Sequence, residues 1–172
     1  MASTVQAQIT NGSGAGTAAS AEGGIGYGRS DEVVAVTTIP IPTSTGTHFS
    51  WAKWLALMVT AGGGSTHISN RKLQLASAPA TGINLWFQAQ TSYTQSSGNA
   101  SADTVANGST PTGYTQITNS AATVYDSSSV ATANGSQNGK YAQVALGVDN
   151  TFVGGGGTLT LPSLNMLYDE GP

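Results

Sequence analysis

The sequence contains no cysteine and very little charge, and both shortages limit what the protein can be. Without cysteine there are no disulfides, no thiolate metal ligands and no thiol nucleophile. Only 8% of the 172 residues are charged, and the net charge is −3 with five Lys and Arg against eight Asp and Glu. So few cations cannot build the basic surface that binds nucleic acid, and we expect no direct nucleic-acid partner.

Long hydrophobic runs are also missing. No stretch of about 18 apolar residues occurs, so the sequence predicts no membrane-spanning segment and no membrane partner. The first residues, MASTVQAQ, lack the basic region and the apolar core that are typical of a signal peptide. We therefore expect no secretory leader.

Glycine is abundant, with 23 residues, and serine and threonine are frequent beside it. Such a composition raises the question of disorder, but disordered chains typically combine low hydrophobicity with high net charge. Here the apolar and β-branched residues stand in compact runs that turn-rich stretches separate. This arrangement indicates a folded all-β protein with long loops.

Residues 1–30 differ in composition from the rest of the chain. The stretch NGSGAGTAASAEGGIGYGRS offers few side chains to bury, and its glycines cost backbone entropy to order. We interpret residues 1–30 as an extended Gly/Ser/Ala-rich arm that docks on its own domain or on a partner, with a flexible tail as the alternative. Residues 31–172 are then one β-sandwich domain, because this length suits a single domain.

Runs rich in β-branched and aromatic residues predict strands along the second region. The predicted strands cover residues 31–42, 47–60, 66–76, 83–94, 114–118, 122–125, 140–148 and 158–168, with polar loops at 95–112 and 126–139. Segment 47–60 fits either a helix capped by Ser50 or a strand, and its strand-like neighbours favour the strand. About seven or eight short strands joined by turns indicate an antiparallel β-sandwich of immunoglobulin-like or jelly-roll type.

The residues that could carry chemistry are scattered along the sequence. His48 and His67 have no carboxylates at metal-site spacing, and we expect both to be structural. Asp126 and Asp149 lie in or beside loops, which leaves calcium open as an alternative, although their spacing is not that of an EF-hand. The GxSxG elbow and the phosphate-binding glycine motifs are absent. We therefore expect no enzymatic activity, no cofactor and no metal.

The tryptophans Trp51, Trp54 and Trp86 leave two interpretations open. They could stack on sugar rings, which would make the chain a carbohydrate-binding module. Aromatic side chains more often fill a core or a subunit interface, where they contribute much of the packing energy. We favour the second interpretation.

Two stretches resemble small structural proteins of tailed bacteriophages. In residues 49–70, FSWAKWLALMVTAGGGSTHISN, an aromatic-Lys-Trp strand runs into a Val-Thr and glycine turn and then into an Ile-Ser-Asn strand. Residues 139–170, GKYAQVALGVDNTFVGGGGTLTLPSLNMLYDE, resemble the closing hairpin of those proteins, with a final Tyr-Asp-Glu. Together the two stretches cover about a third of the chain and contain no catalytic signature.

The resemblance implies a β-sandwich that assembles as a homo-oligomer in a virion. It implies a capsid decoration (cement) protein that binds the major capsid protein and copies of itself, with a tail, baseplate or head–tail joining component as the alternative. Such a protein is made in the host cytoplasm and ends on the capsid surface. Tyr27 and Arg29 are the large side chains of the arm, and we predict that they contact a partner.

Overall fold

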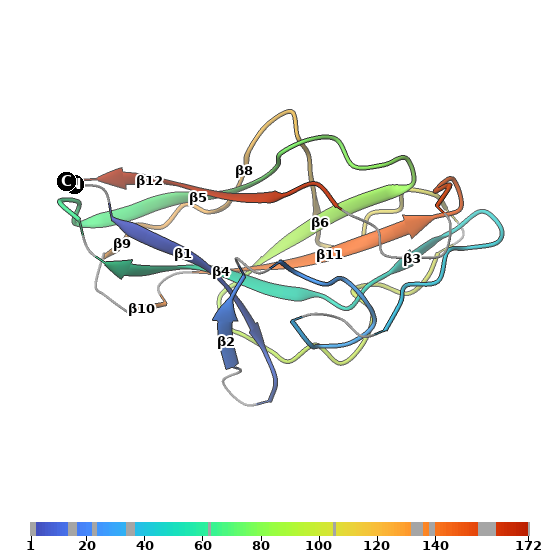
Figure 1. Ribbon diagram of the computed structural model, residues 1–172, viewed down its shortest axis with the longest axis horizontal. Helices are drawn as coiled ribbons and strands as arrows, with labels where there is room; N and C mark the ends of the chain where they lie inside the picture. The colour runs from blue at the N-terminus through green and yellow to red at the C-terminus, as the bar shows by residue number, and fades with distance from the viewer. Residues whose placement is uncertain are drawn as a thin grey trace.

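The computed structural model describes residues 3–13, 17–21, 24–33, 37–61, 63–104, 106–131, 136–137, 140–154 and 161–171. Across these residues the chain forms two antiparallel β-sheets that pack together (Figure 1). The predicted all-β sandwich is confirmed. The described residues contain no helix, and hence none long and apolar enough to cross a membrane.

The larger sheet has the strand order β2-β1-β4-β11-β6-β7 and is antiparallel throughout. Its strands are β1 (Thr4–Asn11), β2 (Thr17–Ser20), β4 (Lys53–Ala61), β6 (Ile83–Gln90), β7 (Thr115–Ile117) and β11 (Tyr141–Asp149). Two short strands join it, since β3 (Thr47–Phe49) pairs with β11 and β10 (Ser136–Gln137) pairs with β4.

The smaller sheet has the order β12-β5-β8, with β9 also paired to β5. Its strands are β5 (His67–Leu75), β8 (Thr123–Asp126), β9 (Val130–Ala131) and β12 (Leu164–Gly171). In β12 the half-buried Leu164 and Met166 alternate with the exposed Asn165 and Leu167. This period of two is that of a strand with one face on a core and the other in solvent.

The core lies between the two sheets. In β6, Ile83, Leu85 and Phe87 all face the smaller sheet, as their spacing of two residues predicts. The core is built from Ile9, Leu55, Leu73, Leu75, Ile83, Leu85, Phe87, Ile117, Tyr125, Ala142, Val144, Leu146 and Val148. The cluster joins both layers, because β1, β4, β6, β7 and β11 of the larger sheet and β5 and β8 of the smaller sheet all contribute to it.

The opposite face of the larger sheet carries a second group of aromatic side chains. Trp86 is only 1% exposed and packs on Phe49, with the ring centroids 5.7 Å apart. Trp54 is 3% exposed and meets Tyr93 and Tyr141 edge-on, at centroid distances of 5.3 and 5.7 Å. For Trp54 and Trp86 the interpretation as packing residues is therefore confirmed.

Most predicted strands lie where the sequence places them. Segment 47–60 forms β3 and β4, and the pairing of β4 with β1 and β11 rules out the helix alternative. Strands β5, β6, β7, β8 and β11 lie inside their predicted ranges or extend one residue beyond them. The predicted loop at 126–139 contains the short strands β9 and β10.

The prediction of a strand at residues 31–42 is wrong for those residues of the range that the structure describes. Residues 31–33 and 37–42 follow an irregular path, and residues 34–36 lie outside the described residues. Pro40 and Pro42 have no N–H to donate to a sheet. The carbonyl of Pro40 instead accepts a hydrogen bond from His48 Nδ1, at 2.9 Å.

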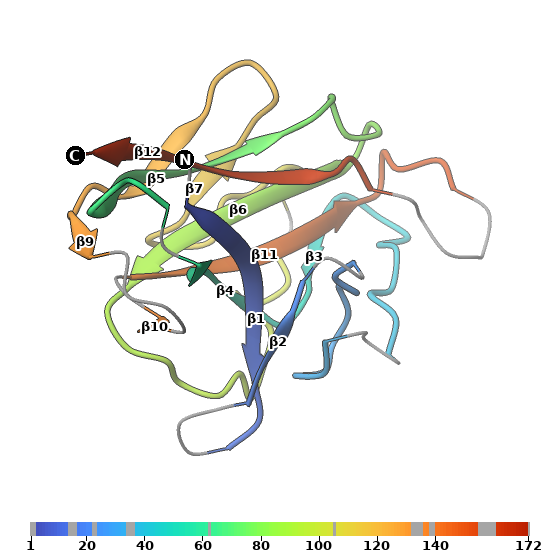
Figure 2. The ribbon, with the colours of Figure 1, turned by 60° about the vertical axis from the view of Figure 1, so that its left-hand side comes forward.

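The interpretation of residues 1–30 as an arm needs the largest correction. Strand β1 pairs with β4 along most of its length and with β2 on its other side, so Thr4–Asn11 is an integral strand of the larger sheet. Of the two docking options, these residues dock on their own domain. Figure 2 shows the pair β1–β2 reaching beyond the other strands at the lower edge of the view.

Candidate functional site

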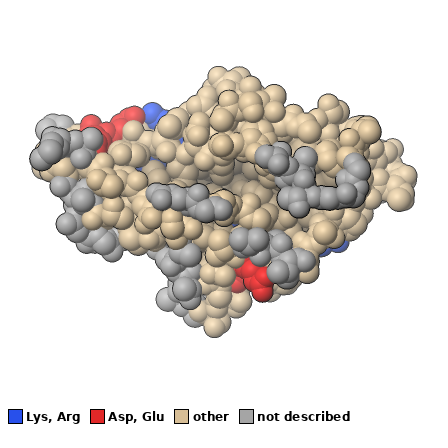
Figure 3. Space-filling model, in the orientation of Figure 1, with Lys and Arg blue, Asp and Glu red and all other residues tan. Residues whose placement is uncertain are grey.

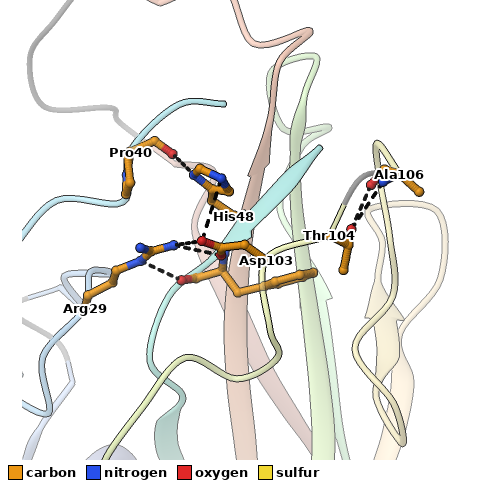
Figure 4. A network of polar contacts seen from close by, with 7 residues as sticks. Arg29, Pro40, His48, Asp103, Thr104 and Ala106 are labelled. Carbon is orange, nitrogen blue, oxygen red and sulfur yellow. Dashed lines mark hydrogen bonds and ion pairs between the residues drawn. The ribbon is translucent and has the colours of Figure 1, made fainter. Parts of the chain in front are cut away.

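A polar cluster joins three segments that are far apart in the sequence (Figure 4). We call Arg29, His48 and Asp103 the Asp103 clasp. Arg29 Nη2 donates to both carboxylate oxygens of Asp103, each at 2.8 Å, and Arg29 Nε donates to the carbonyl of Phe49 at 3.3 Å. The clasp therefore ties the segment before β3 to the long loop at residues 95–112.

His48 and the backbone of β3 complete the surroundings of the Asp103 carboxylate. His48 Nε2 lies 3.6 Å from Asp103 Oδ2, and the N–H of Phe49 donates to Asp103 Oδ1 at 3.2 Å. The side chains of Arg29 and Asp103 are 26% and 33% exposed, so solvent screens their attraction. The carboxylate of Asp103 is engaged by Arg29 and by the backbone of β3, and this geometry suits the clasp to holding the loop in place.

Further contacts fix the same loop beside β3. Thr47 and Thr104 exchange two backbone hydrogen bonds of 3.0 Å, and the N–H of Gly46 donates to Asn107 Oδ1 at 2.8 Å. A Cβ at Gly46 would lie 2.6 Å from the carbonyl oxygen of Thr104, so only glycine allows this approach. The predicted loop at 95–112 is thus anchored to the sandwich at its middle.

Tyr27 lies inward, although the sequence analysis singles it out as a contact residue. Its ring packs against the core, and its hydroxyl is buried without a hydrogen-bond partner. Burial raises the pKa of this hydroxyl above its ordinary value. Arg29, the second predicted contact, is three-quarters buried and already holds Asp103. That either residue also touches a partner stays a prediction.

A buried ion pair links β5 to β8. Arg71 and Asp126 form it with side chains 0% and 1% exposed. The carboxylate of Asp126 also accepts hydrogen bonds from the N–H groups of Ser128 at 2.9 Å and Lys140 at 2.7 Å. Burial alone would raise the pKa of Asp126, but these hydrogen bonds and the charge of Arg71 outweigh it and lower the pKa.

A second buried cation, Lys53, begins β4. It is 2% exposed, and its ammonium group donates to the carbonyls of Ser30, at 2.7 Å, and Glu32. Burial lowers the pKa of Lys53, and the nearby carboxylates of Asp31 and Glu32 oppose that shift. Lys53 therefore anchors residues 30–32 to the sheet.

A shallow groove of about 310 Å³ runs beside the buried Trp54. Polar side chains and the rings of Trp54 and Tyr114 line it, and burial raises the pKa of Tyr114 to about 12. The indole N–H of Trp54 donates to Ser96 Oγ at 3.2 Å, and that hydroxyl donates to the carbonyl of Ala52 at 2.7 Å. The hydrogen-bonding groups of Trp54, Ser96 and Ala52 therefore pair with one another, and the buried Trp54 presents no open ring face to a sugar.

Metal-ligating residues stay dispersed in three dimensions. Within the ranges that the structure describes, no group of three or more His, Cys, Asp or Glu side chains could hold a metal ion. Asp149 Oδ1, one of the calcium alternatives, accepts from the N–H and hydroxyl of Thr151 at 2.9 and 2.5 Å. Asp126, the other, is engaged with Arg71.

The sequence points to Arg29 as a large side chain of the arm, but nothing in it points to its partner Asp103. Asp103 is 74 residues away, and Asp126 is 55 residues from Arg71. No local pattern links such pairs, because only the register of the strands brings them together. Lys53 is the only charged residue in the apolar run at 51–59, and this position is the one signal in the sequence for a buried cation.

Comparison with protein-family models, with curated proteins and with solved structures finds no match to this chain.

Proposed function

We propose that this chain is a non-enzymatic structural protein of a tailed-bacteriophage virion. Within that class we propose a capsid decoration protein, which binds the lattice of the major capsid protein and copies of itself. The resemblance of residues 49–70 and 139–170 to small phage structural proteins supports the class. The sandwich supports it further, because β4, β11, the start of β5 and nearly all of β12 come from these two stretches.

One observation carries the proposal: only 8% of the residues are charged, and the fold leaves few of the Lys and Arg side chains free. Of the five Lys and Arg, Lys53 and Arg71 are buried, and Arg29 and Lys72 are paired with carboxylates. Figure 3 shows one face of the molecule, where charged atoms occupy only small areas. Low surface charge removes the repulsion that keeps copies of a soluble protein apart, and so favours association in a crowded lattice.

The anchored loops suit a protein that must keep a fixed shape in an assembly. The Asp103 clasp holds the loop at 95–112 against β3 before any partner is bound. An interface made of ordered loops loses less conformational entropy on binding than one made of free loops. The pair β1–β2, which reaches beyond the other strands in Figure 2, offers a second ordered surface to a neighbouring capsid subunit.

Co-sedimentation with purified expanded capsids that lack this chain tests the proposal. We expect the chain to pellet with the capsids, to saturate at a fixed ratio to the major capsid protein, and to raise the temperature at which the capsids break open. Binding to isolated tails alone would move the chain to the tail alternative. Binding to neither particle would contradict the virion proposal.

A pair of variants in the same assay tests the predicted contact role of Arg29. Arg29→Ala removes the guanidinium, whereas Asp103→Asn breaks the same ion pair and keeps the guanidinium. If Arg29 touches the capsid, Arg29→Ala weakens binding and Asp103→Asn does not. Equal losses would show that Arg29 acts only by holding the loop.

A further inference from the structure

The smaller sheet ends on one side in a long strand with a single neighbour. Strand β12 has eight residues and is hydrogen-bonded to β5 alone among the described strands. The other described strands with a single neighbour are β2, β3, β7, β8, β9 and β10, and none of them is longer than four residues. An edge strand presents a row of unpaired backbone groups, which is a template for pairing with another strand.

Proline and charge, which normally protect such an edge, stand only before β12 and near its end, and a shift in the register with β5 falls between Leu167 and Asp169. Pro162 comes before the strand, and Asp169 and Glu170 stand near its end. Ser3 contacts that same end, where it touches only the side chains of Tyr168 and Glu170. The first half of the strand, residues 164–167, contains no charge and no proline.

We propose that β12 is a dimerisation edge, which pairs antiparallel with β12 of a second copy of this chain. A two-fold axis at Leu167 would set Asp169 opposite Asn165 and Glu170 opposite Leu164 of the partner copy. The acidic end of each strand then faces the neutral end of the other. A parallel pairing would set the acidic ends against each other, and like charges directly opposite are destabilising.

The side chain at the centre of this pairing is one of the exposed large apolar residues of the protein. Leu167 is 39% exposed on the outer face of the smaller sheet, beside Lys72 of β5. Two-fold pairing would bring the two Leu167 side chains together as a cross-strand pair and remove both from water. The symmetric contact closes on itself, so it produces a dimer and no open chain of subunits.

The backbone of β12 is oriented for this contact. Ser163, the residue before β12, turns its carbonyl toward β5, where it accepts a hydrogen bond from the N–H of Ala76, the residue after β5. Because backbone groups alternate along an antiparallel strand, Asn165 and Leu167 also turn toward β5 and Met166 turns its N–H and carbonyl to the free edge. Leu167 would then face its copy at a pair without mutual hydrogen bonds, the closest kind of pair.

Sedimentation velocity of the purified chain and two variants tests the proposal. Leu167→Glu places like charges opposite each other across the two-fold axis, while Lys72 accommodates the new carboxylate within its own chain. Val124→Glu is the matched control, since Val124 is 45% exposed and pairs with Lys72 from β8, which lies on the side of β5 away from β12. We expect a wild-type dimer, a dissociation constant raised about tenfold or more by Leu167→Glu, and no change with Val124→Glu.

A cross-linking experiment gives a readout that does not depend on stability. The chain has no cysteine, so Leu167→Cys supplies one thiol per copy. The proposed pair has Cα atoms about 4.5 Å apart, inside the range of roughly 4.4–6.8 Å that a disulfide spans. With diamide as oxidant we expect rapid covalent dimer from Leu167→Cys and little from the control Val124→Cys.

A wild-type chain that stays monomeric across the micromolar range would overturn the proposal. A dimer that survives Leu167→Glu and does not cross-link through Leu167→Cys would also overturn it, because another surface would then form the contact. Both measurements use the purified chain without any particle. Their outcome is therefore separate from the test of capsid binding.

Discussion

Removing the charge of Asp126 should cost much of the stability of the fold. The carboxylate is 1% exposed and is the counter-charge of Arg71, which is 0% exposed. Asp126→Ala leaves a guanidinium in the protein interior without its carboxylate, and such a broken pair costs about 3–5 kcal/mol. The N–H groups of Ser128 and Lys140 also lose their acceptor, so we expect a loss toward the upper end of that range.

Urea unfolding at neutral pH, followed by tryptophan fluorescence, measures this loss. Asp126→Asn should cost less than Asp126→Ala, because the amide oxygen can still accept from one N–H. The double variant Arg71→Met with Asp126→Ala should recover about 0.5–3 kcal/mol relative to the sum of the two single variants. Asp169→Asn is the control, since it breaks the exposed pair with Lys72 on the same sheet and should have a much smaller effect.

Two results would refute this reasoning. A loss under about 1 kcal/mol for Asp126→Ala would mean that the pair behaves like a surface salt bridge. Strict additivity in the double variant would mean that Arg71 and Asp126 do not depend on each other.

Three further predictions concern stability. The pKa of Asp126 is lowered in the folded state, so its contribution to the free energy of unfolding is fully present above pH 3.8, its ordinary pKa, and is lost as the pH falls through the lowered value. Unfolding free energies measured across this acid range should show the loss, and Asp126→Asn should reduce the pH dependence. Tyr27→Phe removes a buried hydroxyl without a partner and should raise the unfolding free energy by about 1 kcal/mol, measured in urea. Gly147→Ala places a Cβ 2.5 Å from the buried Trp86 ring and should cost about 1–3 kcal/mol, whereas Gly98→Ala meets open space and should change the melting temperature little.

The sequence predicts the strands whose apolar residues repeat every second position. In β6, Ile83, Leu85 and Phe87 face the core, and the same rule predicts β11. The rule also applied to β1, where Val5, Ala7 and Ile9 alternate with polar residues, but the glycine-rich surroundings concealed it. Ile9 is fully buried in the core, so its alternation was a usable signal.

Strand β1 has the pattern of a strand and was not predicted, whereas residues 31–42 have strand propensity and form no strand where they are described. The β-branched residues of this segment have strand propensity, but Pro40 and Pro42 remove N–H groups from any ladder. β-propensity reflects how a side chain fits its neighbours in a sheet, so it means little where no partner strand is available.

The polar clusters could not be predicted from the sequence. Arg29 and Asp103 come together only because β3 and the loop at 95–112 lie side by side, and Arg71 meets Asp126 through the pairing of β5 with β8. Strand register decides these contacts, and one sequence does not specify the register of distant strands.

Cryo-electron microscopy of intact virions tests the central claim most directly. The account predicts density for this sandwich on the outer capsid lattice, contacting the major capsid protein, with a second copy beside it. Density confined to the tail or neck would contradict the decoration role, and absence of the chain from every part of the particle would contradict the virion proposal altogether.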